Sequence, residues 1–128
     1  MKAELQKILF DKYPKIFRQK DLSMKETAMC WGIDAGPGWF DLIDNLCSDI
    51  QTYIDINELS QVETVQVKEK YGRLCFYIDG GDTVIHDMIS LAEKNSETTC
   101  ENCGSSDASN EETNGWYKTR CIKCKEIR

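Results

Sequence analysis

The fold of this chain is decided by one stretch of sequence, Val62-Glu63-Thr64-Val65-Gln66-Val67-Lys68-Glu69-Lys70-Tyr71-Gly72-Arg73-Leu74-Cys75-Phe76-Tyr77-Ile78. Apolar and polar residues alternate on both sides of Tyr71-Gly72, a pattern typical of strands that cover one face and expose the other. Tyr71-Gly72 supplies a turn between the two runs. The stretch therefore predicts an antiparallel β-hairpin.

Three helices are expected around this hairpin. Residues 3–13 carry Leu5, Ile8 and Leu9 on one side, and Pro14 ends that helix because the residue before proline avoids the helical region. Residues 38–56 and 83–95 also have apolar residues at helical spacing. The predicted inward face of the third helix is made of Val84, Ile85, Met88, Ile89 and Ala92. The predicted fold class is α+β, an antiparallel hairpin or slightly larger sheet packed against helices over residues 1–97.

The segment Met29–Trp39, before the second helix, contains three glycines and one proline. We expect an ordered, packed loop without regular secondary structure, in which Trp31 and Trp39 are both buried. Glycines in front of a helix N-terminus can also hold a phosphate in their backbone N–H groups. The segment lacks the lysine and hydroxyl residue of a P-loop, so a structural role for the glycines is favoured.

Two Cys-x-x-Cys pairs near the C-terminus have 17 residues between them, a spacing that falls in the range of tetrahedral zinc sites. We predict one Zn²⁺ bound by Cys100, Cys103, Cys121 and Cys124. Four thiolates leave no open coordination position, so this zinc would be structural. The alternative is a redox disulfide in each pair, but neither pair lies in the βαβ context expected for one. Residues 98–128 would then form a zinc-ribbon-like module, with a polar, poorly ordered loop at Ser105–Asn114.

Composition favours a globular protein of the cytoplasm. The chain has 128 residues, a net charge of −6 and seven cysteines, with no long apolar run. Its N-terminus does not resemble a secretory signal peptide. Cys30, Cys47 and Cys75 have apolar neighbours and are expected to be buried free thiols of a reducing compartment. No membrane association is predicted.

Charge is segregated along the chain. Between Glu26 and Val67 there is no lysine or arginine, but there are eight acids: Glu26, Asp34, Asp41, Asp44, Asp49, Asp55, Glu58 and Glu63. This acidic belt is either a solvated face or a patch that engages a basic partner. The C-terminal tail is basic, with Lys118, Arg120, Lys123, Lys125 and Arg128. These charges could contact nucleic acid, with Trp116 and Tyr117 stacking on bases, or offset the negative charge of a four-thiolate centre.

The chain shows no apparatus for catalysis. Its single histidine, His86, is expected on the solvated side of the third helix. The carboxylate pairs Asp41/Asp44 and Asp79/Asp82 could bind a hard cation, but capping and helix-dipole roles are favoured. We predict that the protein is not an enzyme, and the sequence identifies no small-molecule substrate.

Four motifs form a further set: Trp31-Gly32-x-x-x-Gly36-x-Gly38-Trp39-Phe40-Asp41-Leu42-Ile43, Val65-x-Val67-Lys68-Glu69-Lys70-Tyr71-Gly72-x-Leu74-x-Phe76-Tyr77, Cys100-x-x-Cys103-Gly104 and Gly115-Trp116-x-x-Thr119-Arg120-Cys121. Together they resemble a family of small proteins encoded by bacteriophages and prophages. The usual Gly-Asp-Gly-Trp of that family is replaced here by Gly36-Pro37-Gly38-Trp39. The resemblance implies a phage accessory protein in the host cytoplasm and assigns no catalytic residue.

These observations lead to two functional expectations. The first is a phage-encoded, zinc-binding interaction module that contacts a host protein through the acidic belt and inhibits a host defence system. The alternative is a zinc-ribbon protein that binds nucleic acid through the basic tail. It is disfavoured because the negative net charge repels nucleic acid on average.

Overall fold

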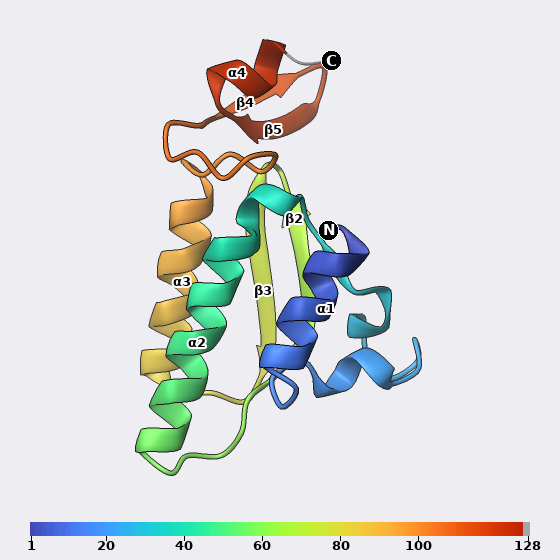
Figure 1. Cartoon of the computed structure of the whole chain (residues 1–128), viewed down its shortest axis with the longest axis vertical. Helices are drawn as coiled ribbons and strands as arrows, with labels where there is room; N and C mark the ends of the chain where they lie inside the picture. Colours follow the sequence, from blue (N-terminus) through green and yellow to red (C-terminus); the bar gives the residue numbers. More distant parts are fainter. Residues whose placement is uncertain (127–128) are drawn as a thin grey trace.

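The computed structural model describes residues 1–126 and has an α+β fold, as predicted (Figure 1). Arg128, part of the predicted basic tail, lies outside the described residues. The helices are α1 (Ala3–Lys12), α2 (Phe40–Ile56), α3 (Thr83–Ser96) and α4 (Ile122–Glu126). Three short 3₁₀ turns are η1 (Arg18–Asp21), η2 (Met29–Trp31) and η3 (Pro37–Trp39). The strands are β1 (Ile33–Asp34), β2 (Glu63–Lys70), β3 (Arg73–Asp79), β4 (Ser109–Thr113) and β5 (Trp116–Arg120).

The predicted hairpin is formed by β2 and β3. The two strands pair antiparallel from Glu63 opposite Asp79 to Lys70 opposite Arg73, with an irregularity between Thr64 and Gln66. Tyr71 and Gly72 have φ values of 55° and 76°, as a two-residue type I′ turn requires. Strand β1 adds a short parallel edge to β2, so the main sheet has the order β1-β2-β3.

Helices α1 and α2 lie in front of the main sheet and α3 runs beside β3 (Figure 1). All three helices match their predicted ranges. The core between them and the sheet is made of fully or almost fully buried side chains, among them Leu9, Phe17, Trp39, Ile43, Ile50, Leu74 and Ile85. Asp82 caps α3 by accepting a hydrogen bond from the N–H of Ile85 at 3.0 Å. The sequence periodicity therefore located the core elements correctly.

The segment Met29–Trp39 is more regular than expected, and only one of its tryptophans is buried. It contains η2, β1 and η3. Trp39 is fully buried, whereas Trp31 is 73% exposed. The reason is that Met29 takes the core position of η2, and Gly32, at φ 77°, then redirects the chain so that Ile33 enters the core. The prediction that Trp31 is buried was wrong.

Two further expectations need correction. Val84 is 43% exposed, because the inward stripe of α3 runs through Ile85, Ile89 and Ala92 and leaves Val84 on the flank. The segment Ser105–Asn114, expected as a loop, contains β4, which pairs with β5 around an Asn114-Gly115 turn. All five residues of β4 are exposed, so no apolar alternation marks this strand in the sequence.

The three cysteines outside the Cys-x-x-Cys pairs differ in burial. Cys47 is fully buried in α2, while Cys30 and Cys75 are only half-buried. The expectation of three buried thiols holds for Cys47 alone, because Cys75 lies on the side of β3 opposite the core. Among residues 1–126, no helix is long and apolar enough to cross a membrane.

Candidate metal centre

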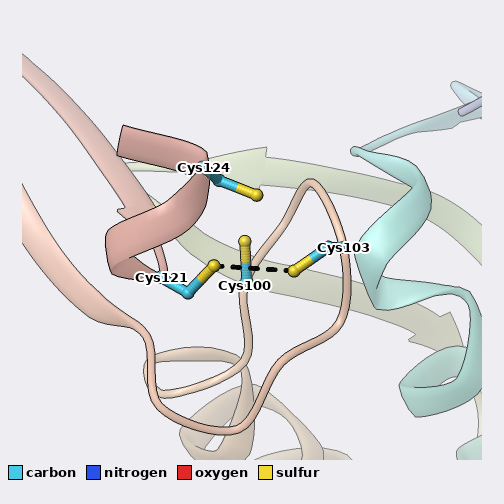
Figure 2. A group of neighbouring side chains, drawn as sticks. All are labelled: Cys100, Cys103, Cys121 and Cys124. Carbon is cyan, nitrogen blue, oxygen red and sulfur yellow. Dashed lines mark hydrogen bonds between the residues drawn. The ribbon is translucent and has the colours of Figure 1, made fainter. Parts of the chain in front are cut away.

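The side chains of the four cysteines in the Cys-x-x-Cys pairs point toward one another and form one cluster (Figure 2). Cys100 and Cys103 come from the turn after α3, and Cys121 and Cys124 from the end of β5 and from α4. Their Sγ atoms all lie within 4.8 Å of one another, and the Sγ atoms of Cys103 and Cys121 are 3.6 Å apart. Tetrahedral thiolates at 2.3 Å from a zinc ion are about 3.8 Å from each other. The donor set therefore fits a single tetrahedral metal ion.

Each pair projects its thiols from a tight turn. The N–H of Gly104 donates to the carbonyl of Cys100 at 2.8 Å, and the N–H of Cys100 donates to the carbonyl of Ser105 at 2.8 Å. Gly104 has a φ of 85°, a left-handed conformation that favours glycine. In the second pair the N–H of Lys125 donates to the carbonyl of Cys121 and begins α4. All seven cysteines are free thiols, so neither pair forms the disulfide of the redox alternative.

The surroundings of Cys100 favour a thiolate, whereas hydrogen bonds with neighbouring thiols raise the pKa of Cys103 and raise that of Cys124 to about 12. Burial raises the pKa of the Cys100 thiol, but the backbone N–H groups of Cys121, Cys103 and Asn102 outweigh it and lower the pKa to about 6. Cys100, Cys121 and Cys124 are buried, and Cys103 is exposed. Four protein ligands leave no position for a substrate, so the site can hold a fold together but has no open coordination site for catalysis.

The glycine-rich loop before α2 packs directly on the first cysteine turn. The N–H of Gly36 donates to the Glu101 carboxylate at 2.9 Å, and the N–H of Gly38 donates to the Glu101 carbonyl at 2.7 Å. A Cβ atom on Gly38 would lie 2.1 Å from the carbonyl oxygen of Cys100. The Trp39 indole N–H donates to the carbonyl of Thr99 at 2.8 Å. The glycines thus serve close packing, and their N–H groups are engaged by protein acceptors rather than free for an anion.

A second contact joins the cysteine turns to the tip of the β2–β3 hairpin. The Thr119 hydroxyl donates to the carbonyl of Gly72, and the Asn110 amide donates to the carbonyl of Tyr71 at 2.8 Å. The N–H of Glu101 donates to the carbonyl of Thr119 at 3.0 Å. Sequence reasoning missed Glu101, Asn110 and Thr119, because no local pattern marks a polar residue that hydrogen-bonds to a distant segment of the chain.

Glu101 is unusual among the residues that make these contacts, because it is an acidic residue that is only 9% exposed. Burial raises its pKa above the usual range of a glutamate, and the hydrogen bond from the Gly36 N–H acts in the opposite direction. A buried carboxylate is tolerated where it is hydrogen-bonded. Glu101 therefore links the candidate metal centre to the loop that begins α2.

The other predicted candidates do not assemble into a site. Asp44 accepts hydrogen bonds at 2.6 Å from Lys12 Nζ and from the Tyr13 hydroxyl, and Asp82 caps α3. His86 is exposed on α3, as expected. Within residues 1–126 the four cysteines are the one group of three or more potential ligands.

The acidic belt is divided by the fold. Asp41, Asp49 and Asp55 are exposed on the outer face of α2. Asp44 lies on the flank of that helix, paired with Lys12, and Glu63 is paired with Arg18. The basic tail is also partly neutralised, because Lys125 pairs with Glu111 at 2.5 Å and Lys118 lies opposite Glu111 in the β4–β5 ladder. The exposed acids of α2 are thus one exposed part of the belt, and Glu26, Asp34 and Glu58 are exposed elsewhere.

Comparison of the chain with protein-family models, with curated proteins and with solved structures gives no match. Function therefore has to be inferred from the residues of the chain itself.

Proposed function

We propose that this chain is a phage-encoded accessory protein with one structural Zn²⁺, which binds a basic surface of a host protein through the outer face of α2. The four-thiol cluster is the observation that carries the metal assignment. A single S₄ tetrahedron favours zinc or iron among biological metals, and a closed site without a redox partner favours zinc. The phage context rests on the motif resemblance, and an inhibitory role in host defence is the use we infer for such a surface.

The metal assignment is tested by elemental analysis of the purified protein. We expect one zinc per chain, and Cys103→Ser is expected to lose most of it because the cluster then has three thiolates. Cys103 is chosen because it is the exposed ligand, so its replacement disturbs packing least. Cys75→Ser, which changes a cysteine outside the cluster, is the control. Iron in place of zinc, or full zinc content in Cys103→Ser, contradicts the assignment.

The proposed interaction surface combines charge with an apolar groove. Between α2 and α3, Leu42, Leu46, Met88 and Leu91 line a groove of about 180 Å³, and Asp49 lies at its side. Leu91 is 60% exposed. An apolar floor beside the acidic side chain of Asp49 is complementary to an amphipathic helix whose polar face carries lysine or arginine. We therefore infer that the host partner presents a basic amphipathic segment.

Charge reversal on α2 tests this surface. Asp49→Lys with Asp55→Lys is expected to slow association with the host protein captured from lysate roughly ten-fold at low salt, since opposite charges steer encounter. The melting temperature should change by only a few degrees, because both acids are exposed. Asp44 is left unchanged because it pairs with Lys12.

Glu4→Lys with Asp107→Lys is the matched control, since it changes the net charge equally at exposed positions away from α2. Equal slowing by the control pair would show a nonspecific effect of net charge. An unaffected Asp49/Asp55 variant would exclude the outer face of α2 as the working surface.

A further inference from the structure

The face of the main sheet that points away from the core is basic and aromatic. In the β2–β3 register Lys68 lies opposite Cys75, Lys70 opposite Arg73 and Gln66 opposite Tyr77, all on the side opposite buried Val67 and Phe76. Lys70, Arg73 and Tyr77 are exposed and Lys68 is half-buried, so this side is largely open, with Tyr117 of β5 beside its end at the hairpin tip. We call Lys68, Lys70, Tyr71, Arg73 and Tyr77 the basic sheet face.

Positive charge is concentrated there in a chain whose net charge is −6. Three cationic side chains lie on the two paired strands, and two nearby acids partly offset their positive charge. Asp34 of β1 lies beside Lys68 in the parallel ladder, and Glu97 is 3.7 Å from Arg73. Lys68 and Lys70 have no carboxylate within ion-pair distance in residues 1–126. This face therefore suits an anionic ligand better than the partly neutralised tail does.

Each lysine of this face lies next to a tyrosine ring. Lys68 Nζ is 6.0 Å from the ring centre of Tyr77, and Lys70 Nζ is 5.6 Å from that of Tyr71. The Tyr71 ring also meets Tyr117 of β5 edge to face, with ring centres 5.4 Å apart. Neighbouring cations and aromatic faces are the combination with which proteins hold single-stranded nucleic acid, because phosphates pair with the cations and bases stack on the rings.

Tyr71 is held in an unfavourable backbone conformation. Its φ of 55° lies in the left-handed region, which asparagine and glycine tolerate and bulky residues rarely occupy. The second hairpin has Asn114 at the equivalent turn position, with a φ of 52°. Burial does not account for the tyrosine, because its side chain is 66% exposed. A strained and exposed aromatic residue is a reason to infer a binding role.

A cleft lies beside this ring. It has a volume of about 440 Å³ and is lined by Tyr71, Arg73, Asn110 and Tyr117, among others. It opens between the hairpin tip and β5, so a base could enter it while the backbone continues along β2 and β3. The cleft therefore marks the end of the face at the hairpin tip, where Glu97 also lines it.

We propose that the basic sheet face binds single-stranded nucleic acid, with phosphates on Lys68, Lys70 and Arg73 and bases stacked on Tyr71 and Tyr77. This site is separate from the outer face of α2 and shares Tyr117 beside its cleft with the C-terminal tail, so it adds a second ligand to the proposed interaction with a host protein. A single strand is preferred over a duplex because only a single strand exposes its base faces for stacking.

The test uses the zinc-loaded full chain and a fluorescent 12-nucleotide thymidine strand, followed by anisotropy. Three phosphate contacts predict a slope of about −2 for log K against log salt, which is about 20-fold weaker binding at 200 mM than at 50 mM salt. Lys68→Ala with Lys70→Ala is expected to weaken binding at least ten-fold at 50 mM salt. Lys25→Ala with Lys94→Ala, which removes two lysines elsewhere, is expected to weaken it less than two-fold.

Tyr71→Asn separates binding from folding. Asparagine suits the turn, so this variant should melt within a few degrees of the parent protein while binding the strand about ten-fold more weakly. Three outcomes would overturn the proposal: no binding at 50 mM salt, equal losses in the two lysine pairs, or full affinity in Tyr71→Asn. Competition by polyglutamate as effective as that by the unlabelled strand would also overturn it, because the face would then accept any acidic polymer, including an acidic protein.

Discussion

The two β-hairpins of this molecule are stabilised by different forces. In β2–β3 one face is buried, with Val67 and Leu74 fully inaccessible and Phe76 2% exposed. In β4–β5 every residue of β4 is exposed, and Thr119 is the one fully buried residue of β5. An isolated two-stranded hairpin is at best marginally stable in water. The first hairpin is therefore stabilised by hydrophobic burial, and the second depends on the cysteine cluster beside it.

The turns of the two hairpins differ in the opposite sense, because the hairpin with the buried face has the less favourable turn sequence. The β4–β5 turn is Asn114-Gly115, the preferred dipeptide of a type I′ turn, whereas the β2–β3 turn is Tyr71-Gly72. A hairpin with a large buried face tolerates an unfavourable turn residue because its register is already specified by burial. A hairpin without such a face needs a favourable turn. The comparison teaches that turn chemistry matters most where packing contributes least.

Loss of the proposed zinc ion should produce the largest difference between the hairpins. A structural four-thiolate zinc contributes on the order of 10 kcal/mol to the order of its surroundings at neutral pH. Chelation should therefore remove hydrogen-exchange protection from residues 98–126, while amides of β2, β3 and α2 keep theirs. Simultaneous loss of protection in both hairpins would show that they fold as one unit, coupled through the Glu101 and Thr119 contacts.

A cavity in the core should produce the reverse pattern. Leu74→Ala removes a fully buried side chain of β3 and is expected to lower the free energy of unfolding by about 3 kcal/mol. Urea unfolding measures this loss, and zinc content should remain one per chain. Thr113→Ala, at an exposed position of β4, should cost less than about 0.5 kcal/mol. A similar cost at both positions would contradict the comparison.

A substitution where the glycine-rich loop before α2 packs on the first cysteine turn should affect both hairpins. In Gly38→Ala the new Cβ would meet the Cys100 carbonyl oxygen at 2.1 Å, so the loop and the cysteine turn must separate. We expect a loss of about 2 kcal/mol, with faster release of zinc to a chromogenic chelator. Ser48→Ala, an exposed change on α2, is the control. Unchanged zinc release would indicate that the junction does not support the metal centre.

The smallest effect is expected at the second turn. Asn114→Ala places alanine at a φ of 52°, which should cost about 1 kcal/mol because a Cβ is unfavourable in the left-handed region. The melting temperature of the zinc-loaded protein reports this loss. The control is Ser90→Ala on the exposed side of α3. Gly80→Ala is avoided because Gly80 also has a positive φ, of 90°. A neutral Asn114→Ala would show that the metal alone specifies this hairpin.

Local patterns were sufficient for the elements that bury one face. Alternation around Tyr71-Gly72 predicted β2 and β3, helical spacing predicted α1, α2 and α3, and the cysteine spacing predicted the four-thiol cluster. The same reasoning failed at β4, which buries nothing, and at β1, which is only two residues long. It also failed at Trp31, because apolar character does not say which of several neighbouring side chains enters the core.

The sequence by itself determined the α+β class, the core helices, the first hairpin and the identity of the candidate metal ligands, because periodicity and ligand spacing are properties of neighbouring residues. Only the tertiary structure decided that Gly36 and Gly38 pack on Glu101 and that Asp44 is paired with Lys12 while Asp49 is free. These relations join segments far apart in the chain, for example Gly36 and Glu101. They arise from how the elements pack, which no local pattern encodes.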